Sequence, residues 1–299
     1  MLIHFIAHVI YIFIILKLES KKRKVDVLVL SDIHLGTYGC RAKELLSYLK
    51  SIKPKVVILN GDIIDIWQFS KRYWPKSHMK VLKHIMRWLS DGKEVYYIPG
   101  NHDELFRKFI NFKMGSFTIK NKLVLDLNGK KAWFFHGDIF DVTMKHTKWL
   151  AKLGGKGYDL LILINTLVNH VSHFFGKGKL SLSKKIKNSV KSAIKFIDDF
   201  EQTAVNLAID KKYNYVVCGH IHQPAYKEII TKKGQVTYLN SGDWIENLTA
   251  LEYRLGEWFI YKYDEKDFNN DAVNSKVESD FINKSHKEIF DQLVTDILV

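Results

Sequence analysis

Cysteine is scarce in this chain, since only Cys40 and Cys218 occur among its 299 residues. The two stand far apart and neither belongs to a Cys-x-x-Cys motif, so the sequence excludes a disulfide framework and a cysteine zinc site. Two unpaired thiols fit a reducing compartment. Proline is also scarce: there are four, with none between Pro99 and Pro224. That gap leaves room for long helices.

Internal repeats and low-complexity segments are absent, and the composition is that of an ordinary globular protein. Hydrophobic residues make up 46% and charged residues 26%, close to globular averages. A length of 299 residues suggests one large domain or two small ones. Acidic residues are outnumbered 32 to 46 by lysine and arginine, which gives a formal net charge of +14. This charge favours anionic partners such as phosphorylated molecules, nucleic acid or acidic lipid surfaces.

The first 20 residues form a hydrophobic segment. Residues 1–16 are apolar apart from His4 and His8, and a basic run follows at 21–24. Counting on to Leu18 gives about 18 residues, the short end of the roughly 17 to 25 that span a bilayer. We interpret segment 1–20 as a membrane anchor that keeps the remainder on the cytoplasmic side. A peripheral helix or a dispensable extension are the alternatives.

The other end of the chain is acidic. From Asp264 to Val299 nine acidic residues stand against four basic ones, so we interpret 264–299 as an acidic tail. Apolar residues recur at helical spacing between Asp280 and Leu298, which predicts an amphipathic helix there.

Short apolar runs rich in β-branched residues predict buried strands. Five of them lie at 25–30, 55–59, 94–98, 132–135 and 215–217. Helical patterns at 42–52 and 78–89 lie between the first three runs, and this alternation predicts an α/β layered fold. Further strands are predicted at 236–239, 249–253 and 258–263.

Residues 139–212 change to long helical patterns, which predicts a helical insertion within a domain spanning 21–263. Part of this insertion, from Lys184 to Lys195, is rich in lysine. Lys184, Lys185 and Lys187 are therefore candidates for contact with a substrate phosphate or a lipid surface.

Acidic residues and histidines directly follow the five predicted strands. The motifs are Asp32-x-His34, Gly61-Asp62, Gly100-Asn101-His102-Asp103, His136-Gly137-Asp138 and Gly219-His220-x-His222. Because the carboxyl ends of strands in α/β sheets meet at one crevice, we expect these side chains to lie together. Such a mixture of carboxylate, imidazole and amide donors suits Mn, Fe, Zn or Co. Two divalent ions about 3.5 to 4 Å apart hydrolyse phosphate esters, so the sequence predicts a two-metal hydrolase.

This ordered series of motifs resembles that of the calcineurin-like metallophosphatases. The resemblance extends from Asp32 to His222, with supporting strands over roughly 24–263. It implies a four-layer α/β/β/α sandwich fold with a helical insertion. It also implies a ligand set: one metal held by Asp32, His34 and His222, a second held by Asn101, His136 and His220, and Asp62 bridging the two.

The same resemblance implies a catalytic pair beside the metals. His102 would steady the phosphate or protonate the leaving group, Asp103 would orient His102, and a metal-activated hydroxide would attack in line.

Within this superfamily the chain is most similar to the UDP-2,3-diacylglucosamine hydrolases of lipid A synthesis and their sister group. The similarity rests on 62–67, the basic insertion, 219–225 and 240–247. It implies cleavage of UDP-2,3-diacylglucosamine to UMP and 2,3-diacylglucosamine 1-phosphate, two divalent ions with Mn²⁺ preferred, and a cytoplasmic place at the inner membrane face.

One position departs from the lipid A hydrolases: His102 stands where the best-known of them carry arginine, whose planar fork binds phosphate with two hydrogen bonds. Another nucleotide or small phosphoester therefore stays open as substrate. Nucleic acid is disfavoured because the aromatic residues fall in predicted strands and apolar helices rather than in a stacking groove. A non-catalytic scaffold at the membrane surface is the alternative of another class, although all seven ligand positions are filled by competent residues.

Overall fold

The structure is a computed structural model that describes residues 22–67, 73–143 and 182–268. The hydrophobic segment 1–20, the predicted helix at 280–298 and residues 144–181 of the predicted insertion lie outside the described residues. The chain divides into two compact units, Met1–Tyr261 and Lys262–Val299. Every predicted site residue belongs to the first. The proposed domain boundaries stay predictions.

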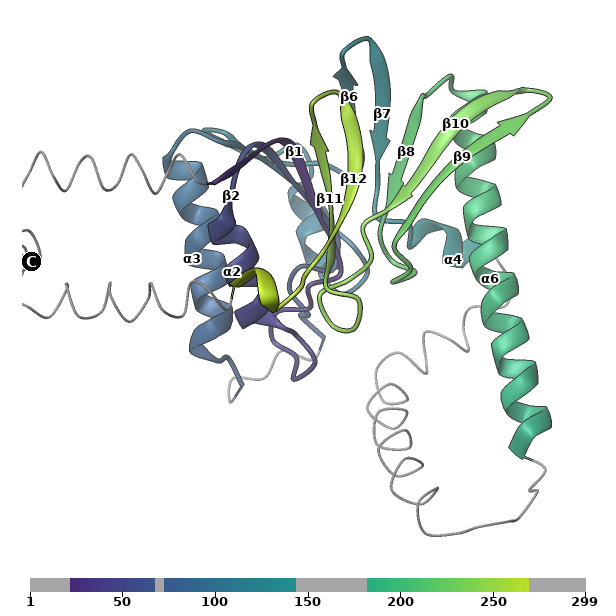
Figure 1. The fold of residues 1–299 in the computed structure, drawn as a ribbon, viewed down its shortest axis with the longest axis horizontal. Helices are drawn as coiled ribbons and strands as arrows, with labels where there is room; N and C mark the ends of the chain where they lie inside the picture. Colours follow the sequence, from purple (N-terminus) through teal and green to yellow (C-terminus); the bar gives the residue numbers. More distant parts are fainter. Residues whose placement is uncertain (1–21, 68–72, 144–181, 269–299) are drawn as a thin grey trace, which may run out of the picture. The chain divides into compact units, whose positions relative to one another are not determined.

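Seven strands form the first sheet (Figure 1). Their order is β12 (Glu257–Lys262), β11 (Thr249–Arg254), β1 (Arg23–Leu30), β2 (Ile52–Asn60), β3 (Glu94–Ile98), β5 (Phe117–Ile119) and β4 (Lys113–Met114). The pairs β1–β2, β2–β3 and β3–β5 are parallel. Register pairs Leu30 with Leu59 and Asn60 with Ile98, so β1, β2 and β3 end at one edge.

Five strands form the second sheet, in the order β6 (Leu123–Leu127), β7 (Lys130–Phe134), β8 (Tyr215–Cys218), β10 (Gly234–Asn240) and β9 (Ala225–Thr231). Strand β8 is parallel to β7 and β10, whereas β6 and β9 are antiparallel to their neighbours. Strands β7 and β8 therefore point their carboxyl ends the same way.

Helices cover the outer faces of the two sheets (Figure 1). Helices α2 (Ala42–Ser51) and α3 (Lys76–Ser90) pack on each other beside the first sheet, and α2 contacts β2. Helix α6 (Leu182–Asp210) packs on β8 and β10 of the second sheet, and the short α4 spans Ile139–Thr143. The predicted four-layer α/β/β/α sandwich is therefore confirmed.

The core lies between the sheets. Val29 and Ile58 of the first sheet pack in one buried cluster with Phe134, Val217 and Leu239 of the second. A second cluster buries the outer face of the second sheet against α6. Each fully buried aliphatic side chain contributes about 1.5 to 3 kcal/mol, so the strand ends that carry the polar motifs are rigidly placed.

Most predicted elements are found, with shifted ends. All five strands that precede polar motifs are present. However, α2 ends at Ser51 and Pro54 lies inside β2 rather than ahead of it. Strands β4, β5, β6 and β9 were not predicted from the sequence. No helix of the described residues is long and apolar enough to span a membrane.

Candidate metal centre

Six of the seven predicted ligands lie in two clusters at the carboxyl ends of the strands. Asp32, His34 and His222 form one cluster, and Asp62, His136 and His220 form the other. Within each cluster the ligand atoms lie within 4.8 Å of one another. The seventh, Asn101, follows β3 and has a buried side-chain oxygen without a hydrogen bond. Their assignment as metal ligands stays a prediction.

The first cluster brings imidazoles against a buried carboxylate. Asp32 is fully buried, and its Oδ2 accepts a hydrogen bond from the backbone N–H of His220 at 3.0 Å. Its other oxygen, Oδ1, lies 3.2 Å from Nε2 of His222. The ring of His34 lies beside that of His222, with centroids 5.5 Å apart.

The second cluster fixes which nitrogen each histidine presents. His136 lies with Nδ1 2.9 Å from the backbone carbonyl of Asn60. A carbonyl accepts only from an N–H, so Nδ1 carries a proton and Nε2 is the nitrogen that can offer a lone pair to a metal. That Nε2 lies 3.3 Å from Oδ2 of Asp62. In His220, Nε2 contacts Oδ2 of Asp141 at 3.0 Å, which leaves Nδ1 as the nitrogen available to a metal.

Asp62 lies between the two clusters. The same Oδ2 that faces His136 is 4.0 Å from Nε2 of His34. The other oxygen, Oδ1, accepts a hydrogen bond from the backbone N–H of His102 at 2.8 Å. A carboxylate shared between two sets of donors is the arrangement that a bridging ligand requires.

The buried polar atoms of this centre fit a divalent cation. Asp32 Oδ1, His34 Nε2, Asn101 Oδ1 and His136 Nε2 are buried without a hydrogen bond among the described residues. Buried polar atoms in native proteins nearly always have partners. Oxygen and imidazole donors of this kind bind first-row divalent metals, so a pair of such cations would satisfy all four atoms.

The electrostatics point the same way. Burial raises the pKa of Asp62, but the neighbouring His136 and His34 outweigh burial and hold the pKa well below its usual value. For His136, burial lowers the pKa, yet the charge of Asp62 raises it well above the ordinary range. In the metal-free protein, protons on imidazoles therefore compensate the buried carboxylates, and a bound cation would replace them.

Two glycines allow the loops to approach this closely. A Cβ on Gly61 would lie 2.1 Å from Nδ1 of His136, and a Cβ on Gly100 would lie 2.2 Å from Oδ1 of Asp62. Both distances are far below a van der Waals contact. Gly61 also has φ +88°, which disfavours any other residue.

Asp65, rather than Asp103, holds the ring of His102. Nδ1 of His102 lies 2.8 Å from Oδ2 of Asp65, and that same oxygen lies 3.3 Å from Nδ1 of His34. Asp65 was not among the site residues predicted from the sequence. The only signal was its place within 62–67, three residues after Asp62.

Asp103, expected from the sequence to orient His102, makes its side-chain hydrogen bonds with other groups in the structure. Its buried carboxylate accepts backbone N–H groups of Ile63 at 2.9 Å and Gly100 at 2.6 Å, together with the hydroxyl of Tyr97. Asp103 therefore ties the loop after β2 to the loop after β3. It supports the site without touching the His102 ring.

Residues 240–247 support the histidines after β8. Asn240 donates its side-chain N–H to the carbonyl of Gly219 at 2.9 Å, and Asn247 donates to the carbonyl of His222 at 2.8 Å. Ser31 and Ser241 join their hydroxyls at 2.7 Å. The loop after β10 thereby fixes the loop that carries His220 and His222.

The predicted lysines are not tested. Lys184, Lys185 and Lys187 belong to the first turns of α6, but their side chains lie outside the described part of the structure. Farther along, α6 contributes Phe200, whose ring lies 6.2 Å from that of His220 and beneath Gly137.

Comparison with known proteins identifies relatives of this chain. The family model described as "Calcineurin-like phosphoesterase" matches residues 25–224. A UDP-2,3-diacylglucosamine hydrolase of Aliivibrio fischeri is 23% identical over 250 residues, which cover 82% of this chain and 100% of the relative. A UDP-2,3-diacylglucosamine hydrolase of Vibrio cholerae is 24% identical over 246 residues, which cover 77% of this chain and 95% of the relative.

Solved structures show a weaker likeness. An archaeal phosphodiesterase aligns with a TM-score of 0.38 and 13% identity, covering 79% of this chain and 98% of its own. A phosphoesterase from E. coli aligns with a TM-score of 0.38 and 12% identity, covering 80% and 99%.

Proposed function

Because the chain belongs to the calcineurin-like phosphoesterase family, we propose that it hydrolyses UDP-2,3-diacylglucosamine to UMP and 2,3-diacylglucosamine 1-phosphate with two divalent ions. The observation that carries the hydrolase proposal is a set of four buried donor atoms without hydrogen bonds, which come from the three loops after β1, β3 and β7. The substrate is taken from the curated relatives, which match 82% and 77% of the chain. We take Mn²⁺ as the metal and the cytoplasmic face of the inner membrane as the location.

The chain's own residues would divide the two ions as follows. Asp32, His34 and His222 would hold one ion; Asn101, His136 and His220 would hold the other; and Asp62 would bind both. When bound, such a pair neutralises the phosphoryl oxygens and lowers the pKa of a water molecule toward neutrality.

His102 would handle the proton of the leaving group. Burial lowers its pKa, but the hydrogen bond with Asp65 and the charge of Asp62 outweigh burial and raise the pKa above its ordinary value. Asp65 occupies Nδ1 at 2.8 Å, which leaves Nε2 for the substrate. As the oxygen of water bonds to phosphorus and gives up a proton to solvent, the P–O bond on the opposite side would break. His102 gives its proton to that departing oxygen.

The structure of the substrate fits a membrane-associated enzyme. A diacylated sugar nucleotide resides at a lipid surface, so an enzyme that acts on it gains from apolar and basic surface. Segment 1–20 and the lysines at 184, 185 and 187 are the proposed contacts from the sequence.

The test is release of UMP from UDP-2,3-diacylglucosamine by the Mn²⁺-loaded full chain. Replacing the shared carboxylate, Asp62→Ala, should lower turnover more than the 10- to 100-fold typical of residues that only support a metal ligand. Asp126→Asn is the matched control, because Asp126 is exposed and bonds only its own turn through the N–H of Gly129. Its turnover should equal that of the unchanged protein.

Three other substrates in the same assay decide between the alternatives. Preference for a simple nucleotide, a generic phosphodiester or single-stranded DNA would overturn the substrate and keep the hydrolase. Protein that neither binds Mn, Fe, Zn or Co nor turns over any of them would be a scaffold, and the proposal would fail.

A further inference from the structure

Four large apolar side chains are exposed in the short segment that follows Asn101 and His102 in the chain. Leu105, Phe109, Phe112 and Met114 are 49%, 55%, 46% and 56% exposed. Leu105 and Phe109 lie in the 3₁₀ helix η1 (Glu104–Phe109), Phe112 lies in the turn that follows, and Met114 lies in β4. Single exposed apolar residues are normal, but a cluster of them marks an interaction site.

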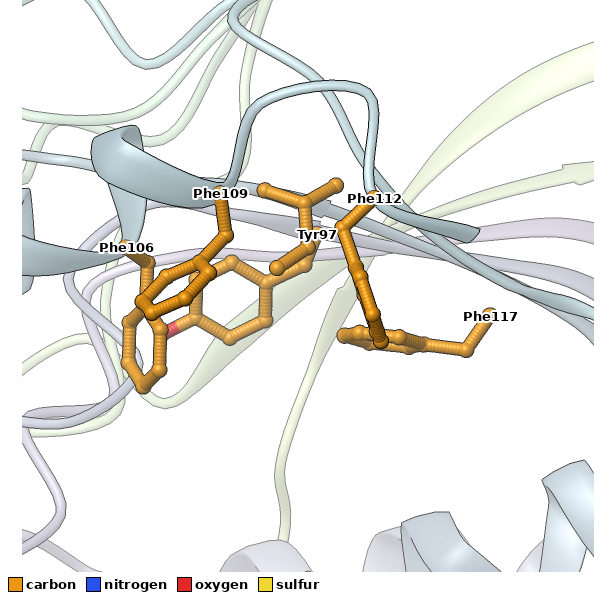
Figure 2. A pocket seen from close by; sticks show the side chains of 6 residues that line it. Tyr97, Phe106, Phe109, Phe112 and Phe117 are labelled. Carbon is orange, nitrogen blue, oxygen red and sulfur yellow. The ribbon is translucent and has the colours of Figure 1, made fainter. Parts of the chain in front are cut away.

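Two of these rings also line an apolar cavity (Figure 2). Phe109 and Phe112 enclose a space of about 330 Å³ together with the remaining lining residues, which are Tyr97, Phe106, Phe117 and Ile119. No polar side chain other than Tyr97 lines it, and the Tyr97 hydroxyl is taken by Asp103. Such a space accepts hydrocarbon and offers nothing to a polar ligand.

The surface is held in place rather than loosely attached. Arg107 donates to the carbonyl of Pro99 at 3.1 Å and to Asp138 at 2.7 Å. Lys120 donates to the side chain of Asn111 at 2.9 Å. Among the residues that the structure describes, β4 is the outermost strand of the first sheet and pairs with β5 alone. The exposed rings therefore project from a preformed edge.

The same segment of the chain is rich in positive charge. From residue 104 to residue 122 the sequence holds five basic residues and one acid, Glu104. Lys108, Lys113 and Lys122 are exposed and form no salt bridge with any residue that the structure describes. Lysine is depleted in protein–protein interfaces, whereas apolar side chains ringed by lysine are typical of surfaces that bind anionic lipid.

We propose that residues 104–122, the η1–β5 surface, dock on an anionic lipid bilayer. Leu105, Phe109, Phe112 and Met114 enter the acyl boundary, and Lys108, Lys113 and Lys122 lie among the lipid phosphates. Asn101 and His102 directly precede this surface, so docking places the metal centre at the bilayer. This last step rests on the proposed lipid-linked substrate.

A fluorescent probe at the surface tests the proposal in the full chain. An environment-sensitive dye is attached at Phe112→Cys, and in a second protein at Met114→Cys. The matched control carries the dye at Leu255→Cys, since Leu255 is 90% exposed in the turn between β11 and β12. The native thiols compete little, because burial raises the pKa of Cys40 to about 12 and that of Cys218 well above its usual value.

Each protein is mixed with vesicles that contain about one third phosphatidylglycerol, with or without brominated acyl chains. Docking predicts that bromine quenches the dye at 112 and 114 at least about threefold more strongly than the dye at 255. Adding Lys108→Gln and Lys113→Gln, or using neutral phosphatidylcholine vesicles, should reduce this quenching at least about twofold.

Equal quenching at 112, 114 and 255 would overturn the proposal even if segment 1–20 holds the protein on the vesicle. If the fluorescence emission of the dye at 112 shifts with protein concentration in the absence of lipid, the proposal is overturned in favour of self-association. Quenching requires neither metal nor turnover, and UMP release is measured on the same proteins. A failed docking surface is thus distinguished from a failed hydrolase.

Discussion

Replacing Asp65 by asparagine keeps the shape of the side chain and removes the charge that two imidazoles share. Oδ2 of Asp65 lies 2.8 Å from Nδ1 of His102 and 3.3 Å from Nδ1 of His34. This contact holds the proton of each ring on Nδ1. It thereby keeps Nε2 of His34 available for a metal and Nε2 of His102 available for the substrate.

The size of the effect follows from the two contacts. A hydrogen bond to a charged acceptor contributes about 1 kcal/mol more than a neutral one. Weakening both bonds therefore costs about 2 kcal/mol, which corresponds to a change of about thirtyfold in an equilibrium or rate constant. Mutations of residues that orient metal-binding histidines typically cost 10- to 100-fold. We therefore expect Asp65→Asn to lower metal affinity and kcat together by about that factor.

Two measurements separate the two histidines. Competition with a chelator gives the metal Kd, which reports His34, and kcat for UMP release at saturating metal reports His102. Asp103→Asn is the comparison, because Asp103 bonds the backbone at Ile63 and Gly100 and should lower the thermal midpoint more than Asp65→Asn. A Kd and a kcat that both stay within about twofold in Asp65→Asn would refute the role of Asp65.

Three further predictions concern the same centre. Gly100→Ala places a Cβ 2.2 Å from Oδ1 of Asp62. It should therefore destabilise the protein by about 1–3 kcal/mol in urea unfolding and abolish metal binding. A metal Kd equal to that of the unchanged protein would contradict the close approach of Gly100 to Asp62. His222 has φ 53°, a conformation that glycine adopts without cost. His222→Gly should therefore be about 1 kcal/mol more stable than His222→Ala, whereas alanine is usually the more stabilising of the two. Equal denaturation midpoints for the two variants would count against backbone strain at this position. In the metal-free protein, burial lowers the pKa of His222 but Asp32 raises it from 6.5 to about 9. The stabilisation from the charged His222 is therefore complete below pH 6.5 and lost as the pH rises through 9. The thermal midpoint of chelator-treated protein should fall over that range. A midpoint that rises instead would refute the ion pair between His222 and Asp32.

The strands and the positions of their polar motifs could be predicted because both signals are local. Residues 25–30 form a run of β-branched and aliphatic side chains that only Asp26 interrupts, and the Asp32 motif follows directly after it. Parallel neighbours then bring Asp32 and Asp62 to one edge. Helix α6 was predictable for the same reason, since its apolar residues recur at helical spacing over several turns.

The partner of His102 could not be predicted, because it depends on how two loops cross. The backbone N–H of Ile66 donates to the carbonyl of His102 at 3.0 Å, and this contact brings Asp65 rather than Asp103 to the ring. Nothing in the spacing of the two acids indicates that crossing. Strand β9 was missed for a different reason: its residues from Tyr226 to Glu228 are exposed and polar at a sheet edge, so no apolar alternation marks it.

The ligand motifs determine backbone conformation as well as chemistry. Ten non-glycine residues in the described ranges have positive φ. Five of them are predicted ligands, namely Asp32, His34, Asp62, His220 and His222. The left-handed region costs about 1–2 kcal/mol per residue, or about 5–10 kcal/mol for five, against a total stability of about 5–15 kcal/mol.

Such strain persists only where the surrounding structure enforces it. Backbone bonds from Asp32 to Gly61 at 3.0 Å and from His34 to Asp62 at 2.9 Å hold the first motif. In Asp32-x-His34 the middle residue, Ile33, is fully buried while both neighbours adopt positive φ. His220-x-His222 repeats the same φ pattern on the second sheet. Two strained turns of one kind therefore face each other across the sheets and bring Asp32 to 3.2 Å from His222. A fold that only needed packing would have no reason to retain this strain at the ends of both strands.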